Sequence, residues 1–118
     1  MLIEERLEKN VVILDLTGNF FFLADGGMDL QNKVKDLIGR GVKNVLLDFR
    51  RVEKINSAGI SVLMNCLKSV TDADGCLKIC SVNESVRHIF RLISMQQLMD
   101  VQPSYDAALQ SFPAEASA

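Results

Sequence analysis

The sequence predicts a single α/β domain built on one mixed β-sheet of four to five strands with about four helices. The chain has 118 residues, enough for one domain with a real core but too few for two. Its apolar segments alternate between short strand-like runs and longer runs with helical spacing, which favours parallel strands joined by helices. Two strand-like runs at the start flank a Lys9-Asn10 turn, and this hairpin adds an antiparallel pair.

The first elements are this hairpin and a helix. Residues 2–7 alternate weakly, and residues 11–16 form a stronger apolar run that residues 17–19 are expected to end. The helix that follows has one apolar face, made of Leu30, Val34, Leu37 and Ile38. The Gly39-Arg40-Gly41 stretch ends this helix, because glycine is favoured just after a helical C-terminus.

The middle of the chain predicts a buried strand followed by a second helix. Residues 45–49 are the strand, and residues 50–54 read as a charged connection with one apolar anchor. The helix begins at Ser57 and runs to about residue 70. Its apolar face is formed by Val62, Leu63, Cys66, Leu67 and Val70. Residues 71–75 are a polar loop.

The last third predicts a strand, a helix, a short strand and a closing helix. Residues 77–82 are the strand, and Asn83 or Ser85 caps the next helix. A final strand is expected within residues 98–101, and Pro103-Ser104 opens the closing helix. The buried stripe of the third helix is Val86, Ile89, Phe90 and Ile93, and that of the closing helix is Tyr105, Ala108, Leu109 and Phe112.

Composition limits the function classes. The net charge is −2 with basic residues scattered among acidic ones, so we expect no nucleic-acid partner. No run approaches the apolar length of a membrane span, and the first residues do not resemble a signal peptide. We therefore expect a cytoplasmic protein without membrane insertion, with the domain at residues 1–112 and a short flexible tail at residues 113–118.

The three cysteines favour packing over chemistry. Cys66 falls on the apolar face of a helix, while Cys76 and Cys80 share one face of a strand. They lack the paired spacing of a zinc site, so we expect no metal and no cofactor.

The most informative stretch is residues 55–60, between an apolar strand and an apolar helix. A serine at this junction, Ser57, stands where unpaired backbone N–H groups and the positive end of a helix dipole meet solvent. Such a position favours an anion, and a phosphate attached to the serine would be one. The plainer interpretation is an unmodified residue at the start of a helix.

Residues 47–60 resemble the signature of the STAS family, whose best-known members are bacterial anti-sigma factor antagonists. Weaker matches at residues 16–18 and 104–109 extend the resemblance along nearly the whole chain. The resemblance implies that Ser57 is the position phosphorylated by an anti-sigma factor of the serine-kinase type. The unphosphorylated protein then captures that factor, phosphorylation ends the capture, and a serine phosphatase restores it.

One residue departs from the family pattern. The aspartate usual before the serine is Asn56 here, which keeps the capping chemistry but loses a negative charge. If that charge helps the kinase to orient or activate the hydroxyl, phosphorylation of Ser57 is slower or absent. A small basic cluster of Arg50, Arg51 and Lys54 beside the loop is available to shield a phosphoserine or to pair with an acidic partner surface.

The predicted partner surface surrounds the serine. The loops that follow parallel strands open at the same sheet edge, so the segments near residues 18–25 and 83–85 should lie beside it. Three consecutive phenylalanines, residues 20–22, cannot all point inward from an extended segment, so one ring is available to a partner. The predicted partner-binding residues are Asn56, Ala58, Gly59, Phe21, Phe22, Asp25 and Asn83.

Two other functions stay open beside the switch. The first is a non-switching STAS scaffold, or an accessory subunit of a signalling complex or membrane transporter, and a homodimer is also open. The second is an enzyme with Ser57 as nucleophile and His88, the only histidine, as base. The chain lacks the Gly-x-Ser-x-Gly elbow and a phosphate-binding loop, so we expect no enzymatic activity and a surface role for His88.

Overall fold

The computed structural model of the chain describes residues 2–20 and 26–113, and within them the predicted α/β class and element order are confirmed. The elements are β1 (Leu2–Glu8), β2 (Val11–Phe20), α1 (Gly26–Gly39), β3 (Asn44–Ile55), α2 (Ser57–Asp72), β4 (Cys76–Cys80), α3 (Glu84–Leu92), the short 3-10 helix η1 (Met95–Gln97), β5 (Asp100–Gln102) and α4 (Tyr105–Ser111).

The strands form one mixed sheet in the order β1-β2-β3-β4-β5. Strand β1 pairs antiparallel with β2 through the predicted hairpin, and the other neighbours pair in parallel. Lys9 in the hairpin turn has a φ of 56°, a left-handed conformation that tight turns require. All carboxyl ends of the parallel strands therefore meet at one edge of the sheet.

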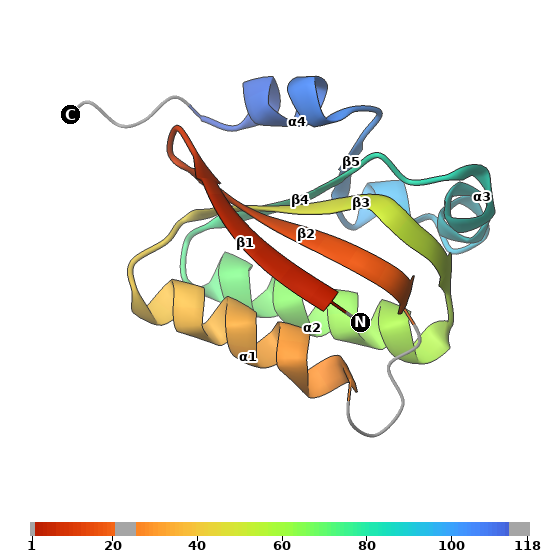
Figure 1. Cartoon of the computed structure of the whole chain (residues 1–118), viewed down its shortest axis with the longest axis horizontal. Helices are drawn as coiled ribbons and strands as arrows, with labels where there is room; N and C mark the ends of the chain where they lie inside the picture. Colours follow the sequence, from red (N-terminus) through yellow and green to blue (C-terminus); the bar gives the residue numbers. More distant parts are fainter. Residues whose placement is uncertain (1, 21–25, 114–118) are drawn as a thin grey trace.

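Helices cover the two faces of the sheet unequally (Figure 1). Helices α1 and α2 lie side by side on one face, and the single short helix α4 lies on the other. Alternate residues of β2 serve the two cores: Leu14 and Leu16 face α1 and α2, whereas Val11 and Ile13 face α4. The smaller core under α4 leaves part of that sheet face uncovered.

Strands β2 and β3 are longer than the sequence pattern predicts. Residues 17–19 do not end β2, which runs to Phe20, and residues 50–54 are not a loop but the second half of β3. Thr17 pairs with Arg51 after one shift of register, and Phe20 pairs with Ile55 after a second. These bulges interrupt the alternation of apolar and polar residues by which a strand is recognised in a sequence. The charged residues 50–54 therefore look like a loop although they pair with β2.

Helix α3 ends one residue before the predicted stripe does. Val86 and Phe90 are buried as expected, but Ile93 lies just beyond Leu92, the last helical residue, and is 39% exposed. Ser94 adopts a left-handed backbone with φ of 54°, which turns the chain into η1 and brings Met95 into the core instead.

The cysteines pack as predicted. Cys66 and Cys80 are buried and Cys76 is half-buried, and all three are free thiols. Burial away from water raises the pKa of Cys66 to about 12 and that of Cys80 to about 11. Both buried thiols therefore stay protonated and inert at neutral pH.

The described part of the chain has neither a membrane-spanning helix nor a metal-binding cluster. Among residues 2–20 and 26–113, no helix has the length and apolar character needed to cross a membrane. The same residues hold no group of three side chains arranged to bind a metal ion. The predicted flexible tail stays a prediction, because residues 114–118 lie outside the described part of the chain.

Candidate functional site

The candidate site is the junction between β3 and α2, at the edge of the sheet where the parallel strands have their carboxyl ends. Asn56 is the N-cap of α2: its backbone is extended, and its Oδ1 accepts a hydrogen bond of 2.9 Å from the N–H of Gly59. Ser57 is therefore the first residue of the helix, and its side chain is exposed. The N–H groups of Ser57 and Ala58 lie in the first turn, where backbone N–H groups have no hydrogen-bond acceptor within the helix.

Backbone contacts with the end of β2 hold this junction in place. The N–H of Asn56 donates to the carbonyl oxygen of Phe20 over 3.4 Å. Gly59 faces the same carbonyl so closely that a Cβ atom there would stand 2.2 Å from the oxygen and 2.6 Å from the Phe20 ring. Gly59 is buried, so its role is to let α2 approach β2 and to fix the direction in which Ser57 points.

A row of aromatic rings supports the junction from inside. The ring of Phe20 lies 5.2 Å from that of Phe49, which lies 6.2 Å from Phe90 on α3, measured between centroids. Phe20 is fully buried, so at least one ring of the phenylalanine run fills the core. Phe21, Phe22 and Asp25 lie outside the described residues, and their predicted contact with a partner stays a prediction.

Asn83 joins a second loop to the same edge. Its Oδ1 caps α3 by accepting from the N–H of Val86 over 2.9 Å. Its Nδ2 donates to the carbonyl oxygens of Val52 and Glu53, over 3.2 Å and 2.9 Å. One side chain therefore clamps α3 to the end of β3, close in sequence to Ser57. The capping was predictable, but the clamp was not, because nothing in the sequence pairs these positions.

The electrostatics at the start of α2 suit an added anion. The first turn of α2 contains no acidic residue, so the positive end of the helix dipole is not already neutralised from within the helix. Asn56 caps the helix without a charge. A phosphoryl group on Ser57 would add about −1.5 to −2 charges at the helix end that tolerates them best.

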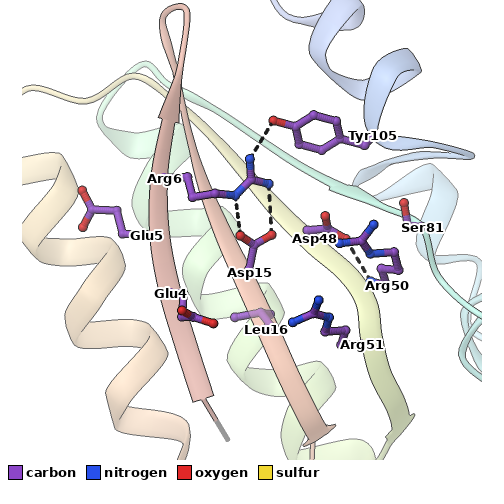
Figure 2. A pocket seen from close by; sticks show the side chains of 10 residues that line it. All are labelled: Glu4, Glu5, Arg6, Asp15, Leu16, Asp48, Arg50, Arg51, Ser81 and Tyr105. Carbon is purple, nitrogen blue, oxygen red and sulfur yellow. Dashed lines mark hydrogen bonds and ion pairs between the residues drawn. The ribbon is translucent and has the colours of Figure 1, made fainter.

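Arg50 and Arg51 point away from the face of the sheet that carries α2. Both line a cavity on the α4 face of the sheet, whereas α2 lies on the opposite face (Figures 1 and 2). Two members of the predicted basic cluster, Arg50 and Arg51, therefore lie on the sheet face opposite α2. The bulge in β3 explains the difference, since it turns two consecutive side chains to one face.

The fold and this junction define a small α/β domain, and a family comparison identifies its class. The STAS domain model matches residues 3–108, so the chain belongs to the STAS domain family. The suspected resemblance is thereby confirmed.

Two curated relatives illustrate the family. The chain is 28% identical over 83 residues to BtrV of Bordetella bronchiseptica, provisionally named an anti-sigma factor antagonist, with 70% of this chain and 72% of that protein covered. It is 24% identical over 104 residues to the anti-sigma F factor antagonist of Paenibacillus polymyxa, with 88% and 86% covered.

Solved structures share the fold at low sequence identity. A Thermotoga maritima protein, TM1081, has a TM-score of 0.83 at 22% identity, covering 92% of each chain. The Bacillus cell fate determinant SpoIIAA, in its phosphorylated form, has a TM-score of 0.69 at 14% identity, covering 92% of this chain and 97% of that one. A sulfate transporter family protein from Wolinella succinogenes scores 0.69 at 18% identity, covering 89% and 86%.

Proposed function

We propose that this STAS domain is a cytoplasmic, non-enzymatic anti-sigma factor antagonist, switched by phosphorylation of Ser57. The observation that carries the proposal is the geometry of Ser57: an exposed first helical residue, on a junction fixed by Asn56 and Gly59. The names of the two curated relatives support the same role. The partner is an anti-sigma factor of the serine-kinase type, and a serine phosphatase reverses its action.

The switch acts at the binding surface. Unphosphorylated Ser57 presents a small hydroxyl that fits into a close protein interface. A phosphoryl group in the same place must be desolvated and also repels acidic groups of the partner. A penalty of about 3 kcal/mol weakens binding more than a hundredfold. The domain itself need not change, because the helix start accommodates the charge.

The proposed contact surface surrounds Ser57. It consists of Asn56 and Ala58 at the start of α2, Asn83 just before α3, and Phe21, Phe22 and Asp25 in the β2–α1 connection. Gly59, predicted to contact the partner, is buried and holds this surface in place from below. Asn83 supports the proposal for two reasons. It is exposed, and hydrogen bonds from its side-chain amide to β3 hold it in place. Its hydrogen bonds fix the start of α3 relative to the end of β3, which lowers the entropy lost on binding.

The direct test is phosphorylation in vitro. The protein is incubated with a candidate anti-sigma factor kinase and ATP, and its intact mass is measured. We expect the mass of one added phosphoryl group, absent in Ser57→Ala and retained in Ser61→Ala. Ser61 is the matched control because it is also exposed and lies one turn further along α2. Equal modification of both variants would contradict the assignment to Ser57.

Binding is measured on the same samples. We expect the unmodified protein and Ser57→Ala to bind the anti-sigma factor with similar affinity, and the phosphorylated protein to bind at least a hundredfold more weakly. Absence of binding by the unmodified protein would overturn the antagonist role itself. Binding that phosphorylation leaves unchanged would overturn only the switch.

Asn56→Asp tests the departure from the family pattern. The variant keeps the cap, since either side chain offers an oxygen to the Gly59 N–H. If the missing carboxylate orients the serine hydroxyl for the kinase, Asn56→Asp is phosphorylated faster than the natural protein. Equal rates would show that the charge at this position has no part in the reaction.

The second candidate function is a non-switching STAS subunit of a scaffold or membrane transporter. Two observations favour it: the uncharged Asn56, and the shared fold of the transporter family protein. It predicts stable binding to such an assembly and no phosphate on Ser57 with any candidate kinase.

A further inference from the structure

A cavity of about 430 Å³ lies on the sheet face that α4 only partly covers, away from Ser57. Figure 2 shows it over β1, β2 and β3, with Tyr105 of α4 at one side and Ser81 at another. We call it the sheet-face cavity. It is lined by Arg6, Asp15, Asp48, Arg50, Arg51 and Tyr105, among others. Its volume is in the range of small-molecule sites.

Carboxylates replace core residues at the floor of this cavity. Asp15 and Asp48 are register partners in β2 and β3, and Glu4 is the partner of Asp15 in β1. The preceding residues on the same face, Ile13 and Leu46, are fully buried in the apolar core under α4. A row of acids across three neighbouring strands departs from the apolar residues that precede it on this face of the sheet. Such departures are common at functional sites.

Asp48 is the most deeply placed of these acids. Asp48 is only 5% exposed, and its Oδ1 accepts a hydrogen bond of 2.9 Å from the backbone N–H of Arg50. A buried carboxylate accepts more than one hydrogen bond, so this group retains acceptor capacity toward the cavity. Groups of this kind favour a ligand that brings hydroxyl donors.

One wall of the cavity is fixed by a second acid. Asp15 holds the guanidinium of Arg6 through Nε and Nη2, and Arg6 Nη1 donates to the Tyr105 hydroxyl over 3.1 Å. The same guanidinium lies 5.1 Å from the centre of the Tyr105 ring. These contacts raise the pKa of Arg6, chiefly through the hydrogen bond with Asp15. The wall is therefore preorganised and joins β1, β2 and α4.

The other two arginines of the cavity differ from Arg6. In the bulge of β3, Phe49 and Arg50 together oppose the single Leu16 of β2, so Arg50 and Arg51 both line the cavity. Among residues 2–20 and 26–113, neither guanidinium has a hydrogen bond or ion pair, although acids lie nearby. A guanidinium fork with free donors is the kind of group that binds a carboxylate or phosphate in proteins.

We propose that the sheet-face cavity binds a small polyhydroxylated acid. The acidic group, a phosphate or a carboxylate, lies between Arg50 and Arg51, and the hydroxyl groups donate to Asp48 and Glu4. The mixed lining supports this class of ligand: a purely apolar molecule would leave the charges unpaired, and a polyanion such as a nucleic acid would meet the carboxylates.

The test is an NMR titration of the whole chain with four compounds. Glucose 6-phosphate and gluconate carry both an acid and hydroxyls; glucose lacks the acid, and inorganic phosphate lacks the hydroxyls. We expect at least one sugar acid to give saturable amide shifts that map to the cavity, with glucose and phosphate binding at least tenfold more weakly. No saturable shift with either sugar acid, or equal affinity for inorganic phosphate, would overturn the proposal.

Variants locate the site. Arg50→Gln combined with Arg51→Gln should weaken the sugar acid at least tenfold, while Arg87→Gln on α3, outside this cavity, should not. Arg50 and Arg51 are both exposed, so the amide spectrum should show that the double variant is folded. Unchanged binding in a folded double variant would overturn the assignment. Ser57→Ala should bind normally, so this result stands apart from that of the phosphorylation test.

Discussion

At the scale of single residues, Gly59 sets the geometry on which the Ser57 site depends. A methyl group there would meet the Phe20 carbonyl at 2.2 Å, and a backbone atom cannot move aside as the end of a side chain can. Gly59→Ala should therefore force α2 away from β2 and lower the free energy of unfolding by about 1–3 kcal/mol, as overpacking of a core does. Urea unfolding monitored by circular dichroism measures this change.

Gly39→Ala is the matched control for this substitution. Gly39 is the last residue of α1, and nothing lies within 4 Å of the position its Cβ would take. Because alanine also restricts the unfolded chain, this variant should be unchanged or up to about 1 kcal/mol more stable. Equal destabilisation by the two substitutions would show that the close approach at Gly59 is not what constrains the residue.

The residues of the serine junction were more predictable than their contacts. The sequence placed Ser57 at the start of a helix and Asn56 in a capping role, because helix starts follow local rules. The Phe20 carbonyl opposite Gly59 and the hydrogen bonds from Asn83 to β3 join residues about 30 to 40 positions apart. No local pattern encodes such pairs, so these contacts required the three-dimensional structure.

At the scale of elements, one carboxylate attaches the edge strand β1 to α1. Glu5 Oε1 lies 2.7 Å from Lys33 Nζ and 3.0 Å from Arg40 Nη2, both on or next to α1. Hydrogen bonds from Lys33 and then Arg40 lower the pKa of Glu5 below its ordinary value. The ionised form is thus favoured in the folded state, and this stabilisation is present above the ordinary glutamate pKa.

Glu5→Gln should reveal this contribution through pH. At pH 7 we expect a loss of less than about 1 kcal/mol, because the pairs are partly exposed and screened by water. The difference from the natural protein should shrink as the pH falls from the ordinary glutamate pKa through the lowered one, since Glu5 is then protonated. Urea unfolding across pH 3–7 is the measurement, with the exposed Glu8→Gln of the same strand as control. A difference that persisted at the acid end would contradict the ionic explanation.

Elements with one regular period were predictable, and those with bulges were not. Helices α1 and α2 follow their apolar spacing closely, although α2 includes Thr71 and Asp72, which the sequence pattern assigned to the following loop. The second half of β3 was hidden because a bulge and four exposed charged residues, Arg50, Arg51, Glu53 and Lys54, break the alternation. The same bulge directs the side chains of Arg50 and Arg51 toward the sheet-face cavity. The irregularity that hides the strand from sequence analysis therefore also places two lining residues of that cavity.

At the scale of the whole molecule, the sheet separates two surfaces. Ser57 belongs to the face covered by α1 and α2, at the carboxyl edge, whereas the sheet-face cavity opens beside α4 (Figures 1 and 2). The strands between them carry a continuous apolar core on the α1 and α2 side. A packed core of this kind resists small displacements, so a charge added at one surface should have local effects only.

Ser57→Asp tests this separation by placing a negative charge where the phosphate is proposed. Because the charge meets the positive end of α2, the free energy of unfolding should stay equal or rise by up to about 1 kcal/mol. Amide shifts in the NMR spectrum should change near the start of α2 and the end of β2, and not around Tyr105 or Arg6. Affinity for the proposed anti-sigma factor partner should nevertheless fall at least tenfold, since the charge would lie in the proposed contact surface. A loss of stability above about 2 kcal/mol, or shifts that spread to α4, would mean that the negative charge acts by altering the domain and not by blocking its surface.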